Sequence, residues 1–332
     1  MQNELYRKII YQKISDLNSS HLKVDIEHIK SGRNNKVFKA ALPSQNYLAK
    51  FYFPSKKLHR SRLNNEFSFL KALTNIGLNN IPKALYRFDD THLAFYEFIE
   101  GESIKKEEID KDHILCAANF FASINEFKDS DFFAKIGDAS EAFKNFENYL
   151  INIDTRINTL KSSIIENNDN TEAIKFINDL ILKWKDVKKD ILSEKSLALP
   201  LEKEFLSPSD FGFHNCIRSK DGTLNFIDFE YAGWDDYAKF LCDFFIQPDF
   251  EIPEKYFEEF SFCALKNQRD KEALIYRAFS LLPLFRVKWC CIILNEFLPD
   301  VVERRLFSDP EFDLISKQYS QLDKAKKLIE KI

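Results

Sequence analysis

Two short predicted strands and the residues beside them constrain the fold of this chain more than any other sequence feature. The strands, Cys216 to Arg218 and Thr223 to Ile227, are separated by a turn that ends in glycine, a pattern typical of a hairpin. Because a hairpin brings its two ends together, Asn215 before the first strand and Asp228 after the second are expected to be neighbours. Asp210 lies in the loop just before them. Carboxylate and amide oxygens of this kind suit magnesium, which also binds phosphate oxygens.

The first hundred residues are predicted to form a small sheet with one main helix. Segments rich in aliphatic and aromatic residues are expected to be strands at 24–29, 36–41, 47–53, 84–88 and 92–99. The helix is expected over 58–73, where Leu63, Phe67, Leu70 and Leu73 recur at helical spacing. A sheet covered by one helix indicates an α+β lobe.

Beyond Glu100-Gly101 the pattern becomes mostly helical. Amphipathic helices are expected over 114–127, within 141–192 and from 237 onward, with a loop and hairpin over 200–236.

The change of pattern predicts an α+β chain of two lobes. The N-terminal lobe is expected over 1–100 and the helical C-terminal lobe over 101–332, with the boundary near residue 100.

Charge and composition exclude several classes of protein. The 48 basic and 52 acidic residues give a net charge of −4, whereas nucleic-acid-binding proteins usually carry a basic excess. No uncharged apolar stretch approaches the ~20 residues of a membrane span, and the N-terminus lacks a signal-peptide core. The six cysteines form no C-x-x-C pair, which argues against a zinc or disulfide framework. We therefore expect a cytoplasmic protein with neither nucleic acid nor membrane as partner.

The spacing of Asp210 and Asn215, followed by the hairpin and Asp228, resembles that of the aminoglycoside phosphotransferase and choline kinase group. These small-molecule kinases have a protein-kinase-like fold, and their catalytic loop has the form His-Gly-Asp-x4-Asn before an Ile-Asp-Phe-Glu/Asp segment. Residues 227–230 reproduce that segment, but Pro208-Ser209 stands where the group has His-Gly. The resemblance implies a bilobal fold with a small antiparallel-sheet lobe for the nucleotide and a larger, mostly helical lobe that holds the catalytic loop, metal site and acceptor cleft.

The resemblance also implies a role for each matched residue. Asp210 would orient the attacking hydroxyl or accept its proton, and Asn215 and Asp228 would hold Mg²⁺ against the phosphates of ATP or GTP. Each residue alone is explained as well by a turn cap or a strand end. The three together, with the hairpin between them, favour catalysis.

The nucleotide itself is expected to meet further residues of the first lobe. Lys50, inside the third predicted strand, would reach the phosphates and pair with Glu66 on the following helix. The alternatives are an edge-strand lysine and an ordinary helix-surface glutamate.

The turn between the first two predicted strands is expected to cover the phosphates. It contains Gly32 and Asn34, and its backbone amides, helped by Arg33 or Lys36, could meet the phosphates. A plain hairpin turn is the alternative.

The resemblance implies a hinge between the lobes at about 96–101. Extended backbone at residues 97–99 is expected to present main-chain groups to the nucleobase, with Glu97 and Ile99 as candidate positions. An ordinary edge strand leading into a linker is the alternative.

The sequence does not determine which small molecule accepts the phosphoryl group. Trp234 and Trp289 could surround a quaternary ammonium by cation–π contact, whereas Asp235 and Asp236 could meet an amino sugar. Tryptophans in apolar helices are more often core residues.

The function expected from these patterns is phosphotransfer from ATP or GTP to a hydroxyl of a small molecule, such as choline, ethanolamine, an amino sugar or another sugar. The alternative is a catalytically weak pseudokinase that binds a nucleotide or metabolite. Its support is the Pro208-Ser209 substitution and the single glycine of the nucleotide loop.

Overall fold

The structure is a computed structural model that describes residues 2–18, 23–29, 34–54, 61–143, 145–167, 171–194, 197 and 204–332. The chain divides into two compact units. The first, called the sheet unit, contains Met1–Glu102, Ile217–Glu230 and Glu303–Phe312. The second, called the helical unit, contains Ser103–Cys216, Tyr231–Val302 and Asp313–Ile332.

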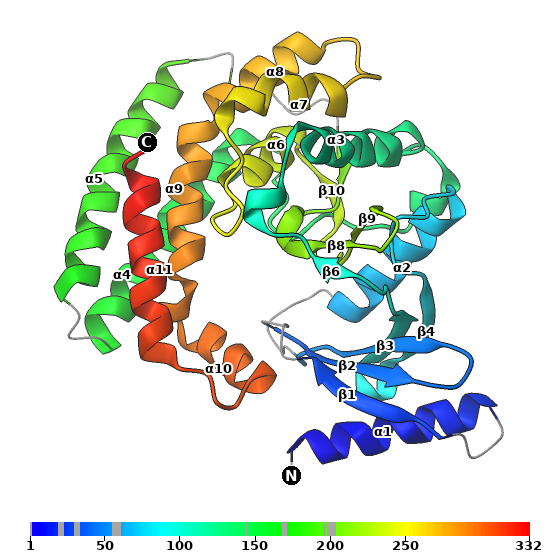
Figure 1. Cartoon of the computed structure of the whole chain (residues 1–332). Helices are drawn as coiled ribbons and strands as arrows, with labels where there is room; N and C mark the ends of the chain where they lie inside the picture. The colour runs from blue at the N-terminus through cyan, green and yellow to red at the C-terminus, as the bar shows by residue number, and fades with distance from the viewer. Residues whose placement is uncertain are drawn as a thin grey trace. The chain divides into compact units, whose positions relative to one another are not determined.

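The sheet unit is built on five antiparallel strands in the order β1-β2-β3-β5-β4 (Figure 1). Their bounds are β1 Asp25–Ile29, β2 Lys36–Ala41, β3 Asn46–Phe51, β4 Ala84–Phe88 and β5 Leu93–Glu97. All five lie at the predicted places, because each segment is rich in the aliphatic and aromatic residues that favour strands.

Two helices pack on this sheet, one more than the sequence predicts. Helix α1 (Gln2–Asn18) buries Ile10 and Ile14 against Phe38, Ala49 and Phe95 of the sheet. The prediction omitted this helix because charged residues interrupt its apolar stripe.

The predicted main helix is α2 (Arg62–Asn75), which contacts β4 and β5. It begins at Ser61, whose side chain accepts a hydrogen bond from the Asn64 N–H, the usual way to satisfy an open helix end.

The sheet unit also contains the predicted hairpin of β8 (Cys216–Arg218) and β9 (Leu224–Phe226), except for Cys216, which falls in the helical unit. The Ser219 N–H donates to the Thr223 carbonyl, and Gly222, with a φ of 88°, completes the turn. Phe226, at the end of β9, donates to the Asn80 carbonyl, which fixes the start of the segment that carries Asp228.

The helical unit consists of helices around a two-stranded antiparallel sheet of β7 (Phe205–Ser207) and β10 (Gly233–Asp235). The sequence predicts a loop at both places, because a strand of only three residues gives too short a pattern to be recognised. The helices are α3 Lys111–Glu126, α4 Phe146–Asn167, α5 Thr171–Ser193, α6 Tyr237–Ile246, α7 Phe257–Ala264, α8 Lys271–Ser280, α9 Leu282–Ile293 and α11 Leu314–Ile329. The short β6 (Glu102–Ser103) and α10 (Pro299–Ser308) lie where the chain passes from one unit to the other.

Stacked aromatic side chains form much of the helical core. Phe121 of α3 stacks on Phe240 of α6 with ring centroids 3.8 Å apart, and Phe244 stacks on Phe260 of α7 at 4.4 Å. Each of these rings buries a large apolar surface in the core.

Within the described residues, no single helix is long and apolar enough to cross a membrane. Residues 271–280 and 282–297 meet the length and composition criteria only together, as a pair bent by 51°.

Candidate active site

A buried lysine is the centre of the site in the sheet unit. Lys50 lies on β3 opposite Val37 and Ala94, with its side chain on the face covered by α2. Its Nζ lies 2.7 Å from Glu66 Oε2 and 2.6 Å from Asp228 Oδ1. The residue is only 5% exposed, so the two carboxylates are what makes burial of its charge tolerable. The structure thus brings together three residues that the sequence analysis singled out.

Glu66 is held by more than the lysine. The Tyr52 hydroxyl donates to Glu66 Oε2 at 2.6 Å, and the Tyr96 hydroxyl lies 2.6 Å from that of Tyr52. Glu66 Oε1 accepts the Phe229 N–H at 3.2 Å. Both carboxylate oxygens therefore have partners, and the Lys50–Glu66 pair has one fixed geometry.

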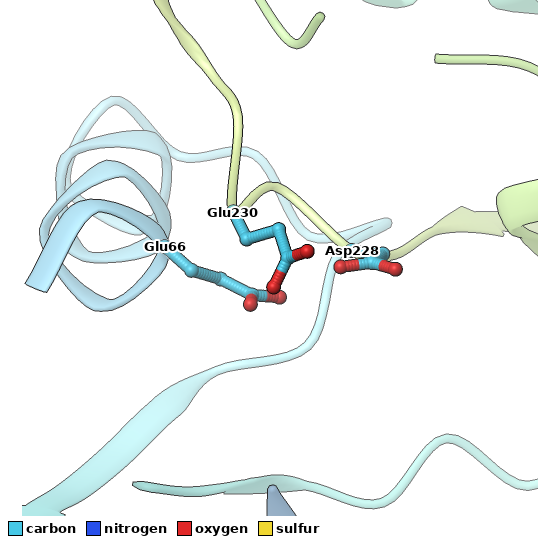
Figure 2. A group of neighbouring side chains, drawn as sticks. All are labelled: Glu66, Asp228 and Glu230. Carbon is cyan, nitrogen blue, oxygen red and sulfur yellow. The ribbon is translucent and has the colours of Figure 1, made fainter. Parts of the chain in front are cut away.

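The segment from Asp228 to Glu230 is fastened to α2. Besides the Glu66 contact, the Asn65 side chain donates to the Glu230 carbonyl at 3.0 Å. Figure 2 shows Glu66 projecting from α2 towards the Glu230 carboxylate, with Asp228 at the other side of the group. Asp228 has a φ of 67°, a left-handed conformation that aspartate and asparagine adopt more readily than most residues.

Glu230 completes the group of carboxylates. It accepts a 2.7 Å hydrogen bond from the Asn35 amide and lies 3.6 Å from Arg62 and 3.8 Å from Lys50. Ligand oxygens of Glu66, Asp228 and Glu230 all lie within 4.8 Å of one another.

The charges of this group do not balance. When Glu66, Asp228 and Glu230 are all ionised, their three negative charges exceed the two positive charges of Lys50 and Arg62 by one. Glu66 and Glu230 are buried, whereas the Asp228 side chain is 36% exposed. Asp228 is therefore the carboxylate that can reach a cation, and its hard oxygens fit magnesium.

The pKa values reflect the shared lysine. The neighbouring carboxylates hold the pKa of Lys50 well above its ordinary value of 10.5, despite its burial. Burial raises the pKa of Glu66 from 4.5 to about 7, opposed by Lys50 and reinforced by Asp228 and Glu230. Lys50 stays charged because carboxylates surround it. These carboxylates also repel one another, and the single ammonium of Lys50 does not offset that repulsion at all three.

The predicted nucleotide loop is only partly described. Gly32 and Arg33 lie outside the described residues. Asn34 accepts a 2.8 Å hydrogen bond from Arg305 Nη1.

Lys36 does not have the orientation expected for a phosphate ligand of this loop. Its Nζ lies between the rings of Tyr6 and Phe307, at 5.3 and 5.4 Å, on the α1 face of the sheet. Lys50 is on the other face, because alternate residues of a strand point to opposite sides.

The predicted hinge follows β5. The Glu97 N–H donates to the Lys83 carbonyl at 2.9 Å and the Phe98 N–H to the Asn46 carbonyl at 3.4 Å. These bonds fix the extended chain before Ile99, whose contact with a nucleobase stays a prediction.

The predicted catalytic loop lies in the helical unit. Asp210 Oδ1 lies 3.1 Å from His214 Nε2, and the Asn215 side-chain nitrogen donates to the Asp210 carbonyl at 2.8 Å. The loop is therefore bound together by its own side chains. The expected proximity of Asn215 and Asp228, which belong to different units, stays a prediction.

Ser209, at the position where the resembling kinase group has glycine, has a left-handed backbone. Its φ is 61°, a conformation that costs most residues energy but suits glycine. The Ser209 N–H donates to Ser207 Oγ at 3.0 Å, which helps to hold the unfavourable conformation.

The two aspartates predicted for the acceptor are buried and paired. Asp235 Oδ2 accepts from Lys239 at 2.7 Å, and both Asp236 oxygens lie 2.9 Å from Arg277 Nη1. Tyr149 also donates to Asp236. Lys239 and Arg277, which belong to the same unit, thus neutralise the charges of the two carboxylates.

The two tryptophans differ from these aspartates in being partly exposed. Trp289 Nε1 donates to Asp243 at 2.7 Å, and Trp234 lies on β10. Their indole rings remain candidates for contact with an acceptor.

Several residues of the site were missed from the sequence. Tyr52 lies inside the strand predicted over 47–53, one residue beyond the observed β3, and Asn35 lies one residue before β2. Nothing in the strand pattern marks either residue as a partner of the carboxylates. Glu230 was visible as the last residue of the Ile-Asp-Phe-Glu segment, and its two-residue spacing from Asp228 could have placed both carboxylates together.

Comparison with known proteins identifies the family. The sequence model described as choline/ethanolamine kinase matches residues 26–272. A search among curated protein sequences gave no match.

Three solved structures illustrate the similarity in fold. Choline kinase LicA from Streptococcus pneumoniae is 18% identical with a TM-score of 0.62, and the alignment covers 98% of this chain and 99% of LicA. LicA has also been solved in complex with AMP. An ethanolamine kinase from Plasmodium vivax is 17% identical with a TM-score of 0.59, covering 93% and 83% of the two chains. The gentamicin complex of APH(2″)-IIa is 18% identical with a TM-score of 0.58, covering 94% of each chain.

These structures confirm the bilobal, protein-kinase-like fold expected from the resemblance. The family match extends over most of the sheet unit, the hairpin with Asp228 and the loop with Asp210. The chain therefore belongs to the choline/ethanolamine kinase family, whose members are small-molecule kinases.

Proposed function

We propose that this protein transfers the γ-phosphoryl group of ATP or GTP to the hydroxyl of a small amino alcohol of the choline or ethanolamine class. The observation that carries the proposal is Lys50, which lies within 2.7 Å of both Glu66 and Asp228. A phosphotransferase needs a fixed cation for the phosphates and an accessible carboxylate for a metal ion, and this arrangement supplies both.

Asp228 and Asn215 are the residues that would hold magnesium, which supplies charge neutralisation at the phosphate oxygens when bound. The net negative charge around Lys50 favours a divalent cation at Asp228. Asparagine ligates metals through its oxygen, and the nitrogen of the Asn215 amide is the atom that binds the Asp210 carbonyl.

Asp210 would position the acceptor hydroxyl. Its carboxylate is partly exposed and its orientation is fixed by His214. A carboxylate held in this way can accept the hydrogen bond of an incoming hydroxyl and take its proton late in the transfer.

Two arguments favour an amino alcohol as the acceptor. The family match is to choline/ethanolamine kinases, and Trp234 and Trp289 are the partly exposed aromatic residues predicted for a cationic head group. The pairing of Asp235 with Lys239 and of Asp236 with Arg277 disfavours recognition of an amino sugar through these two carboxylates.

The test is a product assay with purified protein, magnesium and either ATP or GTP. Choline, ethanolamine, an amino sugar and a sugar alcohol are supplied separately, and the phosphorylated product is identified by mass spectrometry. Asp228→Asn and Asp210→Asn variants exclude a contaminating kinase. A phosphorylated amino alcohol that both variants fail to form supports the proposal. Phosphorylation of the amino sugar alone would overturn the acceptor class, and nucleotide binding without any product would favour the pseudokinase alternative.

A further inference from the structure

A short C-terminal segment, Glu303–Phe312, belongs to the sheet unit although the chain before and after it belongs to the helical unit. It contains the end of α10, labelled in Figure 1. We call it the anchor segment. The hydrogen bonds that join it to the nucleotide loop span 271 and 273 residues of sequence.

Two hydrogen bonds join the anchor segment to the residues directly before β2. Arg305 Nη1 donates to Asn34 Oδ1 at 2.8 Å, and Ser308 Oγ donates to the Asn35 carbonyl at 3.1 Å. Ser308 and Asn35 are both buried. Buried polar contacts of this kind define one conformation, because each broken bond would leave a desolvated group without a partner.

Apolar contacts hold the same segment in place. The Phe307 ring lies edge-on to Phe53 at 5.2 Å and to Tyr6 at 6.3 Å. Its face lies 5.4 Å from the ammonium of Lys36, which is fully buried and has no hydrogen-bond partner among the described residues. The rings of Phe307 and Tyr6 thus face this lysine, and the negative charge of Asp309 in the same segment also favours its charged form.

A continuous buried path leads from the anchor segment to the candidate active site. Asn35, whose carbonyl binds Ser308, donates through its side chain to Glu230 at 2.7 Å. Its side-chain oxygen accepts the Phe53 N–H at 3.4 Å. Glu230 in turn lies 3.8 Å from Lys50. Ser308 is therefore three contacts away from the lysine predicted to meet the phosphates.

We propose that the anchor segment is a positioning element of the phosphate-donor site, with Ser308 and Arg305 as the positioning residues. They hold Asn34 and Asn35, and through Asn35 the Glu230 carboxylate, in the arrangement that binds the nucleotide. The inference rests on the proposed function in one respect: it requires that the sheet unit binds ATP or GTP.

The test uses the full-length protein and the variants Ser308→Ala and Arg305→Ala. Nucleotide Kd is measured by calorimetry with magnesium and ATP, and KM for ATP and kcat are measured with the acceptor found above. Each variant loses one hydrogen bond to the loop, so we expect Kd and KM for ATP to rise about three- to tenfold with kcat nearly unchanged. Glu303→Ala, an exposed position of the same segment, is the matched control and should behave as the wild type.

Rescue distinguishes positioning from general stability. Ser308→Thr keeps the hydroxyl and should restore nucleotide affinity, whatever its melting temperature. If Ser308→Ala and Arg305→Ala are less stable but bind ATP as the wild type does, the inference is wrong. If Ser308→Ala cannot be purified folded, Arg305→Ala and Ser308→Thr still give the comparison. Nucleotide binding by the wild type is measured before any variant is made. If the wild type binds neither ATP nor GTP, both the proposed function and this inference are wrong.

Discussion

Tyr52 donates its hydrogen bond to the same Glu66 oxygen that Lys50 reaches, at 2.6 and 2.7 Å respectively. The Tyr52 hydroxyl therefore donates its one proton to Glu66. In the hydrogen bond between the two tyrosines, the Tyr96 hydroxyl, 2.6 Å away, is then the donor. Two tyrosines thus reinforce the Lys50–Glu66 pair through the Glu66 carboxylate.

Tyr52→Phe should lower the free energy of unfolding by about 1–3 kcal/mol, because it removes a bond to a carboxylate and leaves the buried Tyr96 hydroxyl without its acceptor. Urea unfolding measures the change. The exposed Tyr86 offers a control, and Tyr86→Phe should change stability by less than ~0.5 kcal/mol. In a double-mutant cycle with Tyr96→Phe, the two losses should not add. Full additivity of the two losses would show that the Tyr52–Tyr96 hydrogen bond does not contribute to stability.

Asp228→Asn should separate function from stability. Asparagine also adopts the left-handed conformation of this residue, and its neutral amide leaves two carboxylates facing Lys50 and Arg62. We expect phosphoryl transfer to fall by at least about 10²-fold, while the free energy of unfolding without ligands changes by less than ~1 kcal/mol. Turnover and urea unfolding give the two values, with Asp323→Asn at an exposed helix position as control. A variant that unfolds readily would assign Asp228 to structure instead.

Stability should depend on pH through Glu66. The ordinary pKa of a glutamate is 4.5, and the pKa of Glu66 in the folded protein is about 7. Between these pH values the folded state therefore binds more protons than the unfolded chain. The free energy of unfolding therefore decreases as the pH rises from 4.5 to 7, by at most about 3 kcal/mol from this group.

Glu66→Gln removes the titrating group and should flatten that part of the curve. Urea unfolding at pH 5 and pH 7.5 gives the difference for the wild type and the variant. The exposed Glu258 is the control, and Glu258→Gln should leave the pH dependence of the wild type unchanged. Equal slopes for wild type and Glu66→Gln would mean that Lys50 keeps Glu66 ionised throughout.

Local patterns account for what could be predicted from the sequence. The five strands are rich in aliphatic and aromatic residues, and the resemblance to the kinase group implied the pair of Lys50 on the third strand and Glu66 on the following helix. The alternation of β2 could have placed Lys36 beside Phe38 and Ala40, on the face opposite Lys50.

Contacts between distant segments could not be predicted in this way. Nothing near Ser308 indicates that it binds Asn35, 273 residues earlier. Tyr52 and Glu230 have the same difficulty, since each meets its partner only after the sheet, α2 and the hairpin have formed. Local periodicity determines which face of an element is buried, but not which polar groups meet there.

Ser209 has a left-handed backbone at the position where the resembling kinase group has glycine. The φ of 61° makes this one of four described non-glycine residues in a left-handed conformation. Such a conformation costs an ordinary residue about 1–2 kcal/mol, and the bond from its N–H to Ser207 Oγ does not depend on its side chain. Ser209→Gly should therefore relieve strain, although glycine also increases the entropy of the unfolded chain.

We expect a net gain of about 0.5–1 kcal/mol in the free energy of unfolding, measured by urea unfolding. Ser44 is exposed and is not among the left-handed residues, so Ser44→Gly should give no gain. Since Ser209 precedes Asp210, turnover of Ser209→Gly shows in addition whether serine at this position limits activity. A loss of stability in Ser209→Gly, equal to that of Ser44→Gly, would mean that the backbone here is not strained, and that the serine side chain itself supports the loop.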